Sequence, residues 1–359
     1  MRHSGRCVSR LSGARVLVTG GTGKLGRQLV LALHDAGAHV SVLTRFPETA
    51  SRLWPRSKVD CRYGDLTEPT SLYEVLRDID LVFHLASYSP RPDEPDIYEA
   101  ALHWSVTAEG TRHLVDAAAA TDVAGLIYVS SVKAMGDGAG ANGRPADEST
   151  PARPETLYGR AKLEAEHAIL QAESSGGLHA CVLRLPMVYG LDGKGNLYRM
   201  IDAVARGRFP PWPRVMNRRS AVHVNDAITA AMLVATDTRA AGETYLVTDG
   251  AAYSTRWIYE QICIAFGLAT PAWTMPLWCW RLAAQVGTAV ERVTAKPMPL
   301  TLDALTKLAG DAWYSSHKIR KALPFVSHHR LDTEIPKMVL AYRNGFQRPA
   351  SGSSRRCGI

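Results

Sequence analysis

One glycine-rich turn near the N-terminus constrains the fold of this chain more than any other feature. The apolar, β-branched run 16–19 predicts a strand buried on both faces, and a helical pattern begins at Gln28. Strand, glycine turn and helix in this order are the context in which glycine spacing signals dinucleotide binding. Glycines let the backbone approach a pyrophosphate, and the amides at the helix N-terminus face it. The stretch reads VLVTGGTGKLG and contains Gly20, Gly21, Gly23, Lys24, Leu25 and Gly26.

Predicted strands and helices alternate after this turn. The alternation predicts an α/β fold, a Rossmann-type doubly wound parallel sheet with right-handed crossovers. From Gly190 onward the alternation breaks down into helices and isolated short strands such as 243–247, which predicts a smaller C-terminal α+β substrate lobe. The expected strands are 16–19, 39–43, 59–66, 79–86, 126–131 and 179–185, with a helix over 106–120. We expect an NAD(P)-binding Rossmann domain at 14–189, a substrate-binding lobe at 190–345, and flexible tails at 1–13 and 346–359.

The residue after the second predicted strand bears on the choice of cofactor. An acidic residue about 20 positions past the glycines would hold the ribose 2′-hydroxyl of NAD, whereas an arginine suits the 2′-phosphate of NADP. This chain has Arg45 there, with no Asp or Glu beside it. We therefore expect NADP or NAD, with NADP favoured. A solvated loop residue is the alternative interpretation of Arg45.

Composition excludes several classes of protein. The chain has 359 residues and a net charge of +8, and its basic residues form no stripe interleaved with aromatic ones, so nucleic acid is not an expected partner. Six cysteines form no CxxC pair and twelve histidines form no HExxH spacing, so no metal site is expected. The absence of an apolar signal segment favours a cytoplasmic location.

The most apolar run of the chain is 273–290. It contains Arg281 and Pro276 and is too short for a spanning helix, so no integral membrane segment is expected. A helix packed in the C-terminal lobe or at a subunit interface is the favoured interpretation. Peripheral membrane association is the alternative, because Trp278 and Trp280 could anchor at a lipid surface.

Three residues form a candidate catalytic set. Tyr158 and Lys162 are spaced i, i+4 and so share one helix face, and Ser131 ends a predicted strand. A nearby ammonium is expected to lower the phenol pKa of Tyr158 from about 10 toward working pH, as acid–base catalysis requires. A serine at the carboxyl end of a parallel strand can bind the reacting oxygen. Tyr-x-x-x-Lys alone also fits a solvent-facing helix start, but the glycine turn and the serine favour catalysis.

These motifs resemble the extended short-chain dehydrogenase/reductases, the NAD-dependent epimerase/dehydratase family. The resemblance covers about 14–345 and includes TGGTGKLG, GDL, HLAS, the serine pair and YGRAK. Later motifs resemble the branch of nucleotide-sugar 4-epimerases and 4-ketosugar reductases of bacterial polysaccharide clusters. Those motifs are SSVKAMG, RLPMVYG, GKGNLYRMI and NRRSAVHVND. Two departures are Thr107 in place of the usual asparagine and Met187 where many epimerases have a substrate-binding asparagine.

The resemblance also implies roles for individual residues. Arg219 falls where the family has an arginine that grips the substrate diphosphate, and a guanidinium suits phosphate oxygens. A surface arginine pair, Arg218 and Arg219, is the alternative. Asn196 is a further candidate for substrate binding. The catalytic set implied is Ser131, Tyr158 and Lys162, and the cofactor residues implied are Asp65, Leu66, Ala86, Ser87 and Pro186.

We therefore expect an NAD(P)-dependent epimerase or reductase acting at C4 of a nucleotide-linked sugar such as a UDP-sugar, in polysaccharide precursor synthesis. Tyr158 would remove the 4-hydroxyl proton while hydride passes from C4 to the nicotinamide. A hydroxysteroid- or dihydroflavonol-type NADP-dependent reductase is one alternative, and a non-catalytic nucleotide sensor is another. The expected partner is the nucleotide-sugar substrate, and the chain is compatible with a homodimer.

Overall fold

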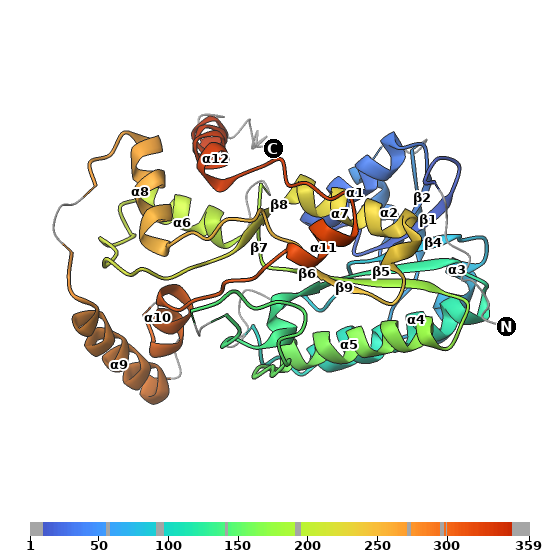
Figure 1. Ribbon diagram of the computed structural model, residues 1–359, viewed down its shortest axis with the longest axis horizontal. Coiled ribbons are helices and arrows are strands. Elements are labelled where there is room, and N and C mark those ends of the chain that lie inside the picture. Colours follow the sequence, from blue (N-terminus) through green and yellow to red (C-terminus); the bar gives the residue numbers. More distant parts are fainter. Residues whose placement is uncertain are drawn as a thin grey trace, which may run out of the picture.

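The computed structural model describes residues 10–54, 58–90, 97–140, 143–190, 195–270, 274–294, 298 and 300–346. Its centre is a seven-stranded parallel sheet of order β3-β2-β1-β4-β5-β6-β9 (Figure 1). The strands are β1 Arg15–Thr19, β2 His39–Thr44, β3 Val59–Tyr63, β4 Leu81–His84, β5 Gly125–Ser131, β6 His179–Leu185 and β9 Thr244–Leu246. The order reverses direction between β1 and β4, which is where ligands bind in such sheets.

Helices cover both faces of this sheet. The helices in and around it are α1 Lys24–Asp35, α2 Pro47–Ala50, α3 Pro69–Leu76, α4 Gly110–Ala120, α5 Leu157–Ser174, α7 Val224–Thr236 and α11 His317–Ala322. One buried cluster joins the sheet to α1, α7 and α11, and another joins it to α3, α4 and α5. The predicted doubly wound architecture is confirmed.

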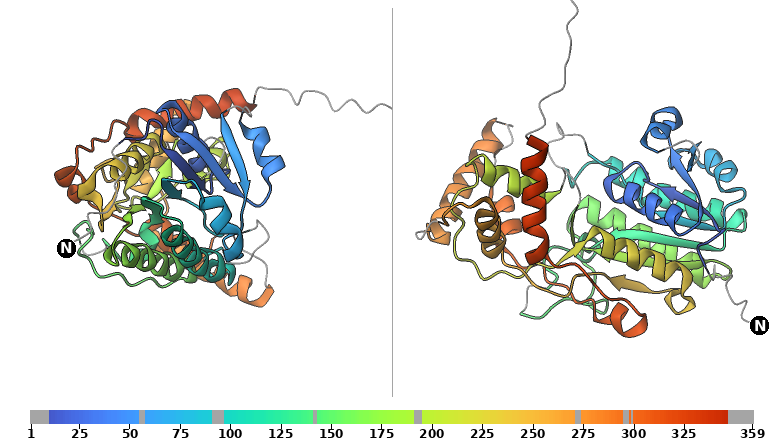
Figure 2. Two further views of the ribbon diagram at one scale, coloured as in Figure 1. Left: turned by 90° about the vertical axis from the view of Figure 1, so that its right-hand side faces the viewer. Right: turned by 90° about the horizontal axis from the view of Figure 1, so that it is seen from above.

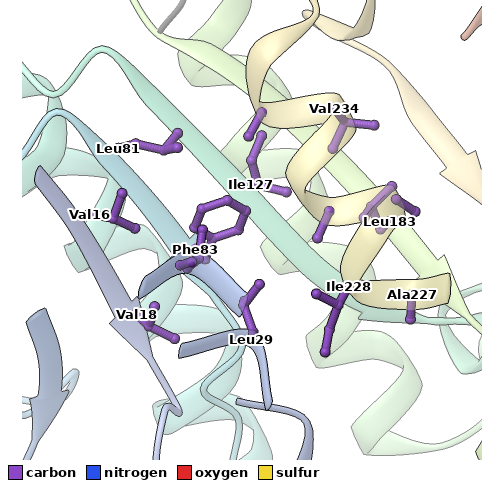
Figure 3. Packing of buried hydrophobic residues seen from close by; sticks show 14 of the residues in the cluster. Val16, Val18, Leu29, Leu81, Phe83, Ile127, Leu183, Ala227, Ile228 and Val234 are labelled. Carbon is purple, nitrogen blue, oxygen red and sulfur yellow. The ribbon is translucent and has the colours of Figure 1, made fainter. Parts of the chain in front are cut away.

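Consecutive residues of one strand serve opposite layers. Leu81 and Phe83 of β4 pack toward α1 and α7, whereas Val82 between them packs toward α3, α4 and α5. Figure 3 shows Phe83 and Ile127 against Leu29 of α1 and Ile228 of α7. Burial on both faces explains why the strands are nearly continuous apolar runs.

The second region holds the remaining helices and lies at the other end of the long axis (Figures 1 and 2). Its core contains Trp212, Tyr259 and Trp280, and short strands β7 and β8 pair in parallel beside it. Its elements are β7 Met187–Tyr189, α6 Asn196–Ala205, β8 Ala221–His223, α8 Thr255–Phe266, α9 Leu277–Thr294, α10 Leu302–Ala309 and α12 Leu331–Phe346. Most of these elements lie within 190–345, the range predicted for a substrate-binding lobe.

Three details differ from the sequence-based boundaries. The segment with α7 and β9 returns to the main sheet, where Leu183 of β6 pairs with Tyr245, so 190–345 is not one continuous lobe. The three-residue length of β9 explains why an isolated strand was expected. Leu11, placed in the flexible tail, is buried against the sheet domain. The expected helix 106–120 begins earlier, with a π-helical turn His103–Glu109 ahead of α4.

Candidate active site

The glycine turn brings β1, α1 and the end of β4 into close approach. A Cβ on Gly20 (φ +69°) would lie 2.7 Å from the backbone nitrogen of Ala86, and one on Gly26 would lie 2.2 Å from the carbonyl oxygen of Gly20. Gly23 is the N-cap of α1 and has no side chain to cap the first-turn amides. The turn therefore leaves bare backbone and a helix N-terminus at the switch point, which fits a pyrophosphate.

The residues expected beside the cofactor lie at strand ends around this turn. The backbone nitrogen of Ala86 donates to Thr19 Oγ1 at 3.2 Å, and the hydroxyls of Ser87 and Thr107 are 3.0 Å apart. Thr107 Oγ1 also accepts from the backbone nitrogen of Tyr88 at 3.2 Å. Thr107 thus fixes the segment after β4, in the position where the family usually has an asparagine.

Arg45, Asp65 and Leu66 follow the ends of β2 and β3. Arg45 is exposed, and no carboxylate pairs with it among the described residues; its guanidinium lies 5.7 Å from the ring centre of Phe46. Asp65 Oδ1 accepts from the backbone nitrogen of Thr67 at 2.9 Å, which holds the turn after β3. Leu66 is buried against α4. The geometry leaves Arg45 accessible to a ligand phosphate.

Tyr158 and Ser131 are brought together by β5 and the first turn of α5. Ser131 ends β5, and its Oγ accepts from the backbone nitrogen of Lys133 at 3.2 Å. Thr156 caps α5 by accepting from the backbone nitrogen of Gly159 at 3.1 Å, which starts the helix that carries Tyr158. Ser131 also hydrogen-bonds the Tyr158 phenol and lowers its pKa.

The pKa of Tyr158 differs from the sequence-based expectation. Burial of the phenol raises its pKa to about 12, and the hydrogen bond from Ser131 only partly opposes that rise. The expected lowering by Lys162 is absent, because that ammonium donates to the carbonyl oxygen of Val129 at 3.1 Å. It also lies 4.8 Å from the ring centre of Tyr128. At neutral pH the phenol of Tyr158 is therefore protonated.

Lys162 is buried beside an ion pair between Glu166 and Arg184. Burial lowers its pKa to about 8, and the carboxylate of Glu166 opposes the shift. Glu166, one helical turn further along α5, accepts from Arg184 Nη2 at 2.6 Å and from Ser130 Oγ at 2.5 Å. Tyr158, Lys162 and Glu166 are spaced i, i+4, i+8, a pattern that could have identified Glu166 from the sequence.

An aromatic side chain beside Tyr158, that of Tyr98, is flanked by two lysine side chains. The ring centre of Tyr98 lies 5.9 Å from that of Tyr158, and the ammonium groups of Lys133 and Lys307 lie 5.3 and 4.6 Å from the Tyr98 ring centre. Lys133 also pairs with Asp137. Sequence reasoning did not identify any of these residues. The only available signal was the position of Lys133, two residues after Ser131.

The rings of Tyr98 and His103 form an aromatic wall beside Tyr158. The ring centre of His103 lies 5.0 Å from that of Tyr158, and its Nε2 is 2.7 Å from the carbonyl oxygen of Ile97. It lies in the π-helical turn, which the sequence pattern did not reveal. The π-helical turn thus places the His103 ring beside the phenol of Tyr158.

Arg219 extends from the second region toward the same cluster. Its Nη1 donates to the carbonyl oxygens of Lys307 at 2.5 Å and Gly310 at 3.4 Å, and burial lowers its pKa. Tyr98 lies near enough to affect that pKa. In the part of the chain that the structure describes, no carboxylate forms an ion pair with Arg219, whereas its neighbour Arg218 pairs with Asp311 at 3.0 Å.

The remaining expected residues have more local surroundings. Lys24 and Leu25 begin α1 and are half-buried, and Pro186 is half-buried between β6 and β7. Asn196 begins α6, where its side-chain oxygen accepts from Arg199. The structure thus does not link Asn196 to the catalytic set, and its substrate role stays a prediction.

Two structural findings limit other classes of site. Within the described ranges, no group of three or more His, Cys, Asp or Glu side chains is arranged to hold a metal ion. No helix in those same ranges is long and apolar enough to cross a membrane.

A glycine turn at the switch point of a parallel sheet, beside a Ser–Tyr–Lys set, defines a dinucleotide-dependent enzyme architecture. The model of the NAD dependent epimerase/dehydratase family matches residues 16–248. The chain belongs to this family, and the resemblance read from its motifs is confirmed.

Curated relatives of this chain include both epimerases and reductases. A UDP-glucose 4-epimerase of Vibrio cholerae is 26% identical over 285 residues, covering 78% of this chain and 85% of that protein. A 4-hydroxy-2-methyl-3-oxo-4-farnesyl-3,4-dihydroquinoline-1-oxide ketoreductase of Stigmatella aurantiaca is 28% identical over 319 residues, covering 87% and 91%. Among solved structures, MoeE5 in complex with UDP-glucose and NAD has a TM-score of 0.71 at 22% identity, covering 93% of this chain and 100% of that one. The family and the two curated relatives support NAD(P)-dependent epimerase or oxidoreductase chemistry, and the solved structure shows the same fold.

Proposed function

We propose that this protein is an NAD(P)-dependent enzyme that acts at C4 of a nucleotide-linked sugar, as an epimerase or a 4-ketosugar reductase. The observation that carries the proposal is Arg219, a guanidinium without a carboxylate partner in the described chain, beside the aromatic wall of Tyr158. A charge that is largely withdrawn from water needs an opposite charge. A diphosphate would supply it, within reach of the Ser131–Tyr158–Lys162 set.

In the proposed reaction, each residue of the Ser131–Tyr158–Lys162 set has a separate role. Tyr158 Oη exchanges the proton of the sugar 4-oxygen, Ser131 Oγ hydrogen-bonds that oxygen, and Lys162 orients the ribose of the dinucleotide. A bound NAD(P), held by the glycine turn and Lys162, would supply or accept the hydride at C4. In the reductase form, Tyr158 Oη would give its proton to the oxygen of the 4-keto group. Burial keeps the Tyr158 phenol protonated at neutral pH, so it carries the proton that a 4-keto oxygen would take.

Arg45 supports a preference for NADP within the proposal. It follows β2, is exposed, and has no carboxylate partner among described residues, so it can meet a 2′-phosphate. An Arg45→Asp variant should favour NAD, because a carboxylate accepts from the ribose 2′-hydroxyl and repels the phosphate. The measurement is the ratio of dissociation constants for NADPH and NADH. An unchanged ratio would exclude Arg45 as the discriminating residue.

The substrate class is tested by incubating the purified protein with UDP-sugars and with 4-keto nucleotide sugars, each with NAD or NADPH. Loss of nicotinamide absorbance with a 4-keto sugar identifies a reductase. Inversion at C4 with no net change in absorbance identifies an epimerase. Cofactor binding without turnover of any sugar substrate would contradict the proposal.

A second candidate is reduction of a ketone on an apolar ring. It is favoured by the Stigmatella ketoreductase relative and by the aromatic side chains of Tyr98 and His103 against Tyr158. A neutral ketone would leave Arg219 without an anionic partner. Turnover of a steroid or prenylated ring ketone, without turnover of nucleotide sugars, would establish this second function.

A further inference from the structure

The outer face of α9 is a stripe of exposed apolar side chains. Trp278 is 62% exposed, Leu282 54%, Val286 64%, Val290 37% and Val293 86%. The spacing i, i+4, i+8, i+12, i+15 places all five on one side of the helix. Helices of water-soluble domains normally turn such a stripe inward, so this outward stripe requires a partner.

The inner face of α9 already has its neighbours. Trp280 packs with its ring centre 5.3 Å from that of Trp212, and a Cβ on Gly287 would lie 1.9 Å from the carbonyl oxygen of Leu300. Thr288 Oγ1 accepts from the backbone nitrogen of Leu302 at 3.0 Å. The helix is thus fixed in orientation. Trp280, one of two expected membrane anchors, is buried, whereas Trp278 is exposed.

The position of α9 leaves the stripe accessible within the described chain. Figures 1 and 2 show α9 at the far end of the second region, away from the main sheet. α10 lies on its inner side, as the contact between Thr288 and Leu302 shows. A flat partner could therefore approach α9 without meeting the sheet domain.

Cationic side chains border the stripe along one flank. Arg281 and Arg292 are eleven residues apart, about three helical turns, so they project on the same side, and both are exposed. Neither forms an ion pair with a carboxylate among the described residues. The nearby loop that carries Trp212 exposes Arg208 and Arg214 as well. These four arginines are complementary to an anionic surface.

The dimensions argue against a second copy as the partner of this stripe. A helix of 18 residues is about 27 Å long, so a stripe about 10 Å wide offers roughly 300 Å². A stable protein interface buries about 800 Å² per partner. An amphipathic helix lying in a lipid interface needs only such a stripe, bordered by arginines.

We propose that α9 binds the surface of membranes that contain anionic phospholipids. Trp278, Leu282, Val286, Val290 and Val293 enter the interface, and Arg281 and Arg292 contact the headgroups. The proposal is independent of the substrate, because α9 contributes no residue to the Ser131–Tyr158–Lys162 set.

The test is flotation of the full chain with vesicles. Vesicles of phosphatidylcholine with phosphatidylglycerol should carry the protein, and those of phosphatidylcholine alone should carry much less of it. Added salt should weaken binding, because screening acts on the arginines. The double variant Leu282→Gln/Val286→Gln should lower the partition coefficient by at least about 10-fold. Trp278→Phe should remove a vesicle-induced blue shift of tryptophan fluorescence.

Matched controls distinguish binding by the α9 stripe from non-specific binding to vesicles. Leu31→Gln/Leu340→Gln alters two leucines, 45% and 58% exposed on α1 and α12, and should bind vesicles like the unaltered chain. Tyr158→Phe should also bind normally. Near-UV circular dichroism checks that the α9 variant is folded. Equal loss in both double variants, or no flotation with either lipid, would overturn the proposal. Light scattering that shows a dimer dissociated by the α9 variant, without vesicle binding, would assign the stripe to a second copy.

Discussion

The sheet domain and the second region hold their key cations in contrasting ways. Lys162 in the sheet domain lies on a buried network in which Glu166 and Arg184 neutralise each other. The guanidinium of Arg219 in the second region donates hydrogen bonds to backbone carbonyl oxygens, and the carboxylates of Asp137 and Asp311 act on it without forming an ion pair. In the first arrangement a buried ion pair lies beside the lysine and helps to position its side chain. In the second, the proposed function assigns the guanidinium charge to a substrate anion. Under that proposal, chemistry and substrate recognition are divided between the two regions.

The largest effect should follow from removing the phenol. Tyr158→Phe deletes the proton donor that the sheet domain positions, so kcat/KM should fall by about 10²–10⁴-fold while cofactor affinity stays unchanged. Tyr73→Phe, an exposed tyrosine on α3, is the matched control and should keep full activity. Steady-state kinetics and cofactor titration measure both. Full activity in Tyr158→Phe would show that the sheet domain does not supply the chemistry proposed here.

The next largest effect concerns stability. Glu166→Gln leaves Arg184 buried without its counter-charge and should lower the free energy of unfolding by about 3–5 kcal/mol, measured by urea denaturation. Glu164→Gln breaks an exposed pair with Arg112 on the same helix and should cost less than about 1 kcal/mol. Equal losses in the two variants would show that the buried network is no stronger than a surface pair.

Of the two regions, only the sheet domain could be predicted largely from the sequence. The alternation of strands and helices, the glycine turn and the spacing of Tyr158 and Lys162 are local patterns, and the structure follows them closely. The site in the second region depends on contacts between distant segments. Lys307 of α10 and Tyr98 meet only because the tertiary fold brings two distant segments together, and nothing in their neighbours in the sequence signals this meeting.

Two errors have the same physical origin. β9 was placed outside the sheet because three residues, Thr244–Leu246, have no periodicity of their own. The pKa of Tyr158 was expected to fall because i, i+4 spacing brings Lys162 near it. In the structure that ammonium donates to the carbonyl oxygen of Val129 instead. Burial of the phenol therefore raises the pKa of Tyr158, with no opposing effect from Lys162. Spacing predicts proximity, whereas the direction of a hydrogen bond depends on tertiary neighbours.

A smaller effect than the first two tests whether Arg219 in the second region binds the substrate. Arg219→Gln removes the proposed diphosphate contact, so KM for a nucleotide sugar should rise by about 10–100-fold with a smaller change in kcat. Arg218→Gln, whose charge is already paired with Asp311, should change KM less than about 3-fold. Initial-rate kinetics on both variants give the comparison. Equal changes would mean that Arg219 is a structural residue like its neighbour.

The last effect is a pH dependence that distinguishes the two cations. Burial lowers the pKa of Lys162 to about 8, whereas an unfolded lysine titrates near about 10.4. Between these values the unfolded chain binds a proton that the folded chain has released. Stability conferred by this position therefore rises with pH, by at most about 1.4 kcal/mol per pH unit, and is flat below pH 8. The difference in unfolding free energy between the unaltered chain and Lys162→Met should follow this rise. Arginine stays protonated across this interval, so the corresponding difference for Arg219→Gln should be level. Parallel curves for both variants would show that Lys162 is charged throughout and that the two regions hold their cations alike.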